Sequence, residues 1–376
     1  MPLPTLKLMS HEPERRSILQ DYGFSQTVVE MLLTVLARDV PAHDPPWERA
    51  HLGNEIFVLD WIAAVDEARR LGALGALRRI LFELNFPIET GISRTPLYQE
   101  LALAGGKDVS AVQHRLPDGP SWENEGGFRF FLHESGIGLI PVLLPGARAD
   151  FLTLIRAIVH QGEPRDIPPS AGSMFINGYR NRRRYLLVRH ALASGVLQPE
   201  WRDPQLWRDK FIIVSDGPYS GVSHETAGYH EGEWAKVSLR IRIEHESTHY
   251  VARRLFPRLK FGLQDELIAD FSGLMQATGQ FSATTFLTFM GLEHFPAYRP
   301  GGRFENYQKE LRVSPESFLA VGRLLCEAAR HLEAGVAGWP LGRWELQKVR
   351  LVALLTRSSL EEMAAGNCQS FFQDPA

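Results

Sequence analysis

The chain has few cysteines, no excess of charge of one sign and no long hydrophobic run. Only two of its 376 residues are cysteines, Cys326 and Cys368, which excludes a disulfide scaffold and a metal cluster made of cysteines alone. Lys and Arg total 41 against 44 Asp and Glu, a formal net charge of −3, so we expect no nucleic-acid partner. The most apolar window, residues 138–144, is too short to cross a bilayer of about 30 Å, so we expect no membrane association.

The N-terminal residues carry no pattern typical of a signal peptide. Pro2, Pro4 and Lys7 interrupt this part of the chain, and a charged run over residues 11–16 follows directly. A signal peptide needs an uninterrupted apolar segment in this place. We therefore expect a cytoplasmic protein.

What the sequence does have is 13 histidines in an otherwise ordinary globular composition, with 44% hydrophobic and 23% charged residues. This composition excludes a disordered, collagen-like or coiled-coil chain as a description of the whole. Because thiolates are scarce, a transition metal in this protein has to be held mainly by imidazoles and carboxylates.

Apolar residues with helical spacing run through most of the chain. The predicted helices of the first half span residues 25–38, 54–71, 73–84, 150–160 and 185–193, and helices resume from residue 234. Residues 210–215 are the best strand candidate. Pro and Gly concentrate in residues 162–172, which is typical of a connection between domains. We predict a mainly helical α+β protein with a helical N-terminal region, residues 1–169, and a second domain, residues 170–376.

The most informative residues are His245-Glu246-Ser247-Thr248-His249. Two histidines four residues apart on a helix lie one turn apart on the same face, so both imidazoles can bind one metal ion. Glu246 lies between them, where it can accept a proton from water activated by that ion. The spacing predicts a metal site with His245 and His249 as ligands.

The residues around this motif favour a helix over a strand. A stripe that includes Ile241, His245 and Leu255 has helical spacing and ends before Pro257. Residues 237–243 also alternate between apolar and polar side chains, as a strand would. We predict a helix from His245 to Leu255 and leave its first residue open.

Two histidines leave a catalytic zinc site one protein ligand short. A second predicted helix, residues 265–274, carries Glu266 and Asp270 four residues apart on one face. Pro257 and Gly262 lie between the two helices, so the first helix can end, turn and return antiparallel as the second. The second helix can therefore bring carboxylates to the histidines.

The combination of His245-Glu246-x-x-His249 with Glu266-x-x-x-Asp270 resembles the gluzincin arrangement of thermolysin-like zinc metallopeptidases. The resemblance covers only the two helices of the metal site. It implies a zincin-like second domain in which Zn²⁺ is bound by His245, His249 and Glu266. It also implies that Glu246 is the general base and that Asp270 steadies a ligand histidine, in agreement with the physical role of a carboxylate behind a ligating imidazole.

Reaction at a carbonyl also needs a donor for the developing oxyanion. The candidates that follow the second helix are His294, Tyr298, Arg303, Tyr307 and His331. We retain Tyr307, Arg303 and His331 as candidate catalytic residues. A structural role is the alternative for each of them.

Residues 224–231 contain two more histidines, but their spacing of six residues fits no helical face. Because this segment is rich in Gly and polar residues and precedes the helix that carries His245 and His249, one hypothesis is that it forms a lid over the site. An ordinary surface loop is the alternative.

Five arginines gather in a short stretch of the sequence: Arg180, Arg182, Arg183, Arg184 and Arg189. We expect them to form a solvated helix face or internal ion pairs. A pocket for an anionic substrate is the alternative.

These patterns together predict a zinc-dependent hydrolase of the metallopeptidase type, acting on peptide or amide bonds. The first alternative is a cytoplasmic zinc enzyme that is not a peptidase, such as a hydrolase, lyase or cyclase acting on a small molecule in a biosynthetic pathway. The second is a binding or toxin-like module with a structural metal. The sequence does not indicate an oligomeric state.

Overall fold

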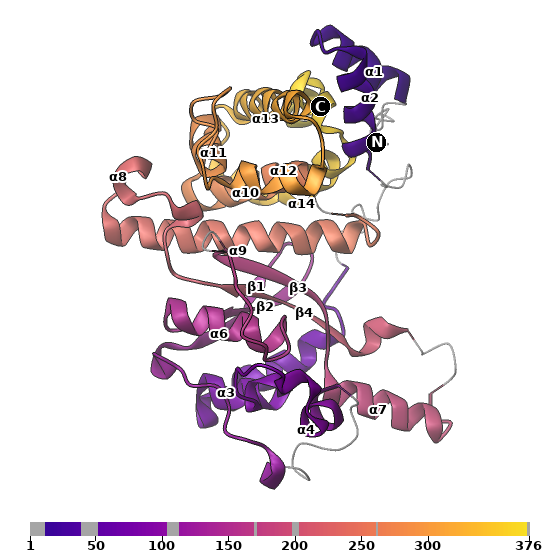
Figure 1. Ribbon diagram of the computed structural model, residues 1–376, viewed down its shortest axis with the longest axis vertical. Helices are drawn as coiled ribbons and strands as arrows, with labels where there is room; N and C mark the ends of the chain where they lie inside the picture. The colour runs from indigo at the N-terminus through magenta and orange to yellow at the C-terminus, as the bar shows by residue number, and fades with distance from the viewer. Residues whose placement is uncertain are drawn as a thin grey trace. The chain divides into compact units, whose positions relative to one another are not determined.

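Helices dominate the structure, and four strands form one mixed sheet (Figure 1). The structure is a computed structural model that describes residues 12–38, 52–103, 113–168, 171–197, 203–260 and 262–373. It divides into unit 1, Met1–Leu52 with Gly217–Ala376, and unit 2, Gly53–Asp216. The prediction of a mainly helical α+β protein is confirmed.

This division differs from the predicted boundary at 169/170, which falls inside unit 2. The reason is the sheet: β2 (Leu139–Leu144) precedes that boundary and pairs in parallel with β4 (Arg208–Val214), which follows it. The Pro- and Gly-rich segment is therefore a connection within one unit. Unit 2 is an insertion in the sequence of unit 1.

The sheet of unit 2 has the strand order β1-β2-β4-β3, where β1 is Arg129–Glu134 and β3 is Ser173–Arg180. The two outer pairs are antiparallel and the central pair is parallel. Central strands are covered on both faces, and accordingly β2 and β4 carry continuous apolar runs. The predicted strand 210–215 corresponds to β4.

Helix α3 (Phe57–Ile80) packs against the sheet, and Gly72 interrupts its helical backbone with a φ of 74°. The two helices predicted on either side of residue 72 thus become one helix with a kink. Trp61 of α3 is fully buried against the rings of Phe130 and Phe211. Within the described residues, the other α-helices of unit 2 are α4 (Pro96–Tyr98), α6 (Arg148–Ile158) and α7 (Arg182–Ala193).

Unit 1 consists of helices in the part that the structure describes. These are α1 (Glu12–Asp21), α2 (Gln26–Val35), α8 (His224–Ala227), α9 (Glu231–Leu255), α10 (Leu263–Thr278), α11 (Ala283–Met290), α12 (Arg303–Leu311), α13 (Pro315–Val336), α14 (Leu341–Arg357) and α15 (Leu360–Ala364). Helix α9 packs against α10 and α14, and α13 packs against α2, α11 and α15. The N-terminal helices α1 and α2 therefore belong to the same core as the last helices of the chain.

Within the described ranges, no helix is long and apolar enough to cross a membrane.

Candidate metal centre

Helix α9 carries the His-Glu-x-x-His motif in its second half. It begins at Glu231, so residues 237–243 are helical, and the alternation seen in the sequence does not form a strand. Every residue from Glu244 to Ala252 is buried. The helix ends at Leu255, two residues before Pro257, as predicted.

The first turn of α10 is fixed by Asp265. The backbone N–H of Gly262 donates to the Asp265 carboxylate at 2.8 Å, which closes the N-terminus of the helix. The guanidinium of Arg38 donates to both oxygens of the same carboxylate, at 2.7 and 3.1 Å. Glu266 is the next residue, so its backbone is held in place from two directions.

Helices α9 and α10 cross closely at Gly273. A Cβ atom at this position would lie 2.9 Å from the backbone oxygen of Ile241 on α9, closer than side chains approach without displacement. Asp270 lies one turn of α10 before this crossing, and His245 lies one turn of α9 after it. The absence of a side chain at residue 273 thus lets the carboxylates of α10 reach the imidazoles of α9.

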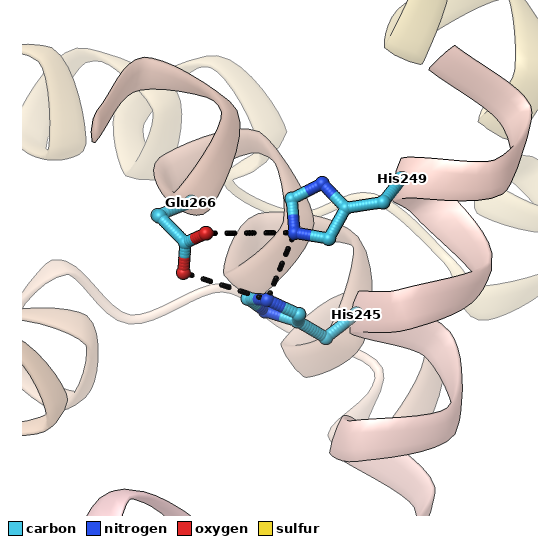
Figure 2. A group of neighbouring side chains, drawn as sticks. All are labelled: His245, His249 and Glu266. Atoms are coloured by element: carbon cyan, nitrogen blue, oxygen red, sulfur yellow. Dashed lines mark hydrogen bonds and ion pairs between the residues drawn. The ribbon is translucent and has the colours of Figure 1, made fainter. Parts of the chain in front are cut away.

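The imidazoles of His245 and His249 and the carboxylate of Glu266 point toward one another (Figure 2). The Nε2 atoms of the two histidines are 3.1 Å apart. Glu266 Oε2 lies 3.5 Å from His245 Nε2, and Glu266 Oε1 lies 3.5 Å from His249 Nε2. The structure therefore brings together the three predicted ligands.

These separations are close to those found around a tetrahedral metal ion. A tetrahedral ion with N and O ligands at about 2.0 to 2.2 Å holds its ligand atoms roughly 3.3 to 3.6 Å apart. The two Nε2 atoms, 3.1 Å apart, come within a few tenths of an ångström of that range, and each of them lies 3.5 Å from a different oxygen of Glu266. Two imidazole nitrogens and a carboxylate are also a donor set that suits zinc, and it suits iron as well.

His245 is oriented by Asp270 and by Tyr219, a residue of the 3-10 turn Tyr219–Gly221 before α8. Nδ1 of His245 lies 2.7 Å from Asp270 Oδ1 and 2.9 Å from the Tyr219 hydroxyl. The same hydroxyl donates to Asp270 Oδ1. A hydrogen on Nδ1 directed at the carboxylate leaves the lone pair on Nε2, on the side of the ligand group.

The electrostatics of this group favour positive charge. Burial alone would raise the pKa of Glu266, but His245, His249 and Arg303 outweigh it and hold that pKa well below its usual value. Burial alone would lower the pKa of His249, but Glu266 and neighbouring carboxylates, among them Glu246, raise it. The three ligand atoms thus surround a point suited to a cation, whether a proton on an imidazole or a metal ion.

Glu246 is buried and follows His245 directly on the same turn of α9. It is not among the three residues whose ligand atoms converge. Its charge is one of those that raise the pKa of His249.

Residues 17–367 match the family described as a family of unknown function, DUF7005. The chain belongs to the DUF7005 family. No curated protein and no solved structure matches it.

Of the three candidate oxyanion donors in this DUF7005 protein, Arg303 and Tyr307 come from α12, and Arg303 contacts a predicted metal ligand. Arg303 binds Glu266 and Asp270 directly. Tyr307 lies one turn further along α12; burial and the charge of Glu266 raise its pKa, against the opposing charge of Arg303. The guanidinium of Arg303 is therefore occupied by carboxylates.

The other candidates lie in different surroundings. His331 is on α13, where its ring lies so near Gly366 that a Cβ atom at residue 366 would be 3.2 Å from it. The ring of Tyr298 packs on Phe304 and Phe318, which is a structural contact. His294 is exposed.

Sequence reasoning did not identify Tyr219. It is buried, and burial together with the charge of Asp270 raises its pKa well above the usual value. No motif surrounds it, and it lies 26 residues before His245 in the sequence. Only the aromatic residue in the turn 216–221 could have served as a signal.

Two further segments from the sequence analysis are residues 224–231 and the clustered arginines. Residues 224–227 form the short helix α8, and Tyr229 stacks on Trp234 of α9 at a centroid distance of 5.4 Å. Among the clustered arginines, Arg184 pairs with Asp60 and Asp209, and Arg182 lies over the ring of Phe82. Internal ion pairing, the first expectation for this cluster, is thus found for Arg184.

Proposed function

We propose that this protein is a zinc-dependent hydrolase of the gluzincin-like metallopeptidase type, acting on peptide or amide bonds. The observation that carries the proposal is the convergence of two imidazole nitrogens and a carboxylate, 3.1 to 3.5 Å apart, with a second carboxylate behind one imidazole. Glu246 beside this group supplies what a structural metal site does not need, a buried base.

Each residue has a distinct task in the proposed reaction. His245, His249 and Glu266 hold the metal, and Asp270 with Tyr219 keeps the lone pair of His245 directed at it. When bound, Zn²⁺ lowers the pKa of water and polarises the carbonyl oxygen of the substrate.

Glu246 moves the proton. Its carboxylate accepts a proton from the attacking water as the new carbon–oxygen bond forms, and it passes this proton to the leaving nitrogen as the carbon–nitrogen bond breaks. Tyr307 is the proposed donor to the developing oxyanion, since the guanidinium of Arg303 already binds two carboxylates.

We also propose a cytoplasmic location. Cys326 and Cys368 are both free thiols, as is usual in a reducing compartment. Fractionation of cells that express the native chain tests this point. Recovery outside the cytoplasmic fraction would contradict it.

The decisive experiment is metal analysis of the purified wild type beside Glu246→Gln and His249→Ala, with turnover assays on a peptide library and on small esters, lactones and amides. We expect zinc in the wild type and in Glu246→Gln, loss of zinc in His249→Ala, and a rate reduced at least about 100-fold in Glu246→Gln. Equal metal content in all three proteins contradicts the site. Retained zinc with no effect of Glu246→Gln on activity identifies a structural metal, and turnover confined to small molecules contradicts the peptidase assignment.

A further inference from the structure

Arg303 connects Glu266, the predicted metal ligand on α10, with Asp270, the carboxylate that orients His245. It is the first residue of α12, and its guanidinium is largely buried. Nη1 donates to Asp270 Oδ2 at 2.8 Å and to Ser220 Oγ at 3.2 Å. Nη2 donates to Glu266 Oε2. One planar group therefore bridges Glu266 and Asp270.

The two oxygens of Glu266 are not equivalent. Oε2 accepts the charge-assisted hydrogen bond from Arg303 and lies 3.5 Å from His245 Nε2. Oε1 lies 3.5 Å from His249 Nε2. A carboxylate oxygen that accepts a hydrogen bond from a guanidinium has less electron density to give to a metal ion. Oε1 is therefore the better donor.

The two oxygens of Asp270 are also both engaged. Oδ1 faces His245 Nδ1 and accepts from the Tyr219 hydroxyl, and Oδ2 accepts from Arg303. Because Asp270 is fully buried and fixed by these three partners, it is a firm anchor for the guanidinium. The position of Arg303, and through it the rotation of the Glu266 carboxylate, is thus set by the same residue that orients His245.

We infer that Arg303 is a positioning residue that restricts Glu266 to one oxygen, Oε1, toward the metal. The inference rests on the proposed metal site and concerns how many coordination positions the protein uses. A carboxylate that binds through both oxygens takes one position more than a carboxylate that binds through one. A catalytic zinc site needs an open position beside its three protein ligands, and Arg303 keeps that position free by holding Oε2.

Charge supports the same conclusion. Glu246, Glu266 and Asp270 place three carboxylates around two imidazoles, and Arg303 offsets one of these negative charges. A lysine at this position has a single point of charge and cannot bridge the two carboxylates in one plane. Arg303→Lys is therefore expected to keep much of the charge balance and to lose the control over Glu266.

The test uses Co²⁺ in place of zinc, because its visible absorption is strong in four-coordinate sites and weak in sites of higher coordination. Wild type, Arg303→Met and Arg303→Lys are loaded with Co²⁺, and metal affinity is measured by competition with a chelator. We expect a four-coordinate spectrum for the wild type, a several-fold weaker band for both variants, and a metal affinity that falls by about 10- to 100-fold in Arg303→Met.

Arg299→Met is the matched control, since Arg299 lies in the preceding loop and pairs with Glu293 away from the metal ligands. Its Co²⁺ spectrum should equal that of the wild type. Wild-type intensity in Arg303→Met and Arg303→Lys overturns the inference while the metal site stands. A wild type that binds no Co²⁺ overturns the proposed function and the inference with it. Should Arg303→Met fail to fold, Arg303→Lys carries the same two readouts.

Discussion

Arg184 in unit 2 and Arg303 in unit 1 are both buried arginines that bridge two carboxylates, yet their surroundings differ in kind. Arg184 donates to Asp60 at 2.9 Å and also to Asp209. Asp209 further accepts hydrogen bonds from the Trp61 indole and the Asn181 amide, both at 3.0 Å. The Asp209 carboxylate of unit 2 is therefore surrounded by hydrogen-bond donors of the chain itself.

In unit 1 the two carboxylates that bind Arg303 face imidazoles instead. Asp270 orients His245, and Glu266 faces the Nε2 atoms of His245 and His249. Burial raises the pKa of Asp209 to about 6, against the opposing charge of Arg184, whereas the pKa of Asp270 is lowered because Arg303 and His245 outweigh burial. A buried arginine that binds two carboxylates can thus be purely structural. It becomes part of a candidate site only where those carboxylates also face predicted metal ligands.

The largest expected effect that tests this comparison comes from Arg184→Met. Removing one partner of a buried ion pair leaves Asp209 without its counter-charge, which costs about 3–5 kcal/mol of unfolding free energy. Urea unfolding measures this loss, and metal analysis should show an unchanged zinc content. Arg189→Met, at an exposed position of the same helix, is the control and should change the unfolding free energy by less than about 0.5 kcal/mol. Loss of zinc in Arg184→Met would contradict the view that Arg184 is structural and that Arg303 alone of the two supports the metal site.

Gly273→Ala tests how closely unit 1 must be packed. The added methyl group meets the Ile241 backbone oxygen, so α9 and α10 have to separate. We expect a loss of about 1–3 kcal/mol in unfolding free energy and a weaker metal affinity, because Glu266 and Asp270 move with α10. Chelator competition and urea unfolding measure the two effects. Gly232→Ala on α9, with open space around its Cβ position, should show neither; if both variants behave alike, the close crossing does not position the ligands.

The smallest expected effect concerns Glu83 in unit 2, which has a tyrosine as its partner. Tyr179 donates to its carboxylate at 2.6 Å, and burial raises the pKa of Glu83 from 4.5 to about 7. A group whose pKa is raised on folding stabilises the protein fully below the unfolded pKa and loses that contribution as the pH rises through the folded pKa. Unit 2 should lose about 1–3 kcal/mol between about pH 5 and pH 8. Glu83→Gln should flatten this dependence, and an unchanged pH profile in that variant would assign it to another group.

The ligand helices could be predicted because their signals are local. The spacing of His245 and His249 requires only a helix, and Pro257 and Gly262 mark the turn between α9 and α10. The close helix crossing could not be predicted in this way. A glycine in a helix reads as a weak helix former, and its role at residue 273 depends on the position of Ile241 on another helix.

In the sheet, the sequence pattern predicted a central strand but not the edge strand β3. Central strands such as β4 have continuous apolar runs, which made the strand over 210–215 visible. The edge strand β3 is mostly half-buried and contains an irregular register between Asn177 and Tyr179, so neither alternation nor a continuous run is present. The unit boundaries could not be predicted either, because they depend on which strands pair, and β2 pairs with β4 across the predicted boundary.

The sequence order of the two units has a consequence for synthesis on the ribosome. Arg15 of α1 pairs with Glu361, 346 residues away, and α2 packs on α13. These N-terminal helices leave the ribosome first, and their partners leave it last, after the whole of unit 2. The apolar side chains of α2, such as Leu32, therefore have to wait for the C-terminal helices before they can be buried. Unit 2 is contiguous and can form its sheet during that interval, so the candidate metal centre is among the last parts of the molecule to be completed.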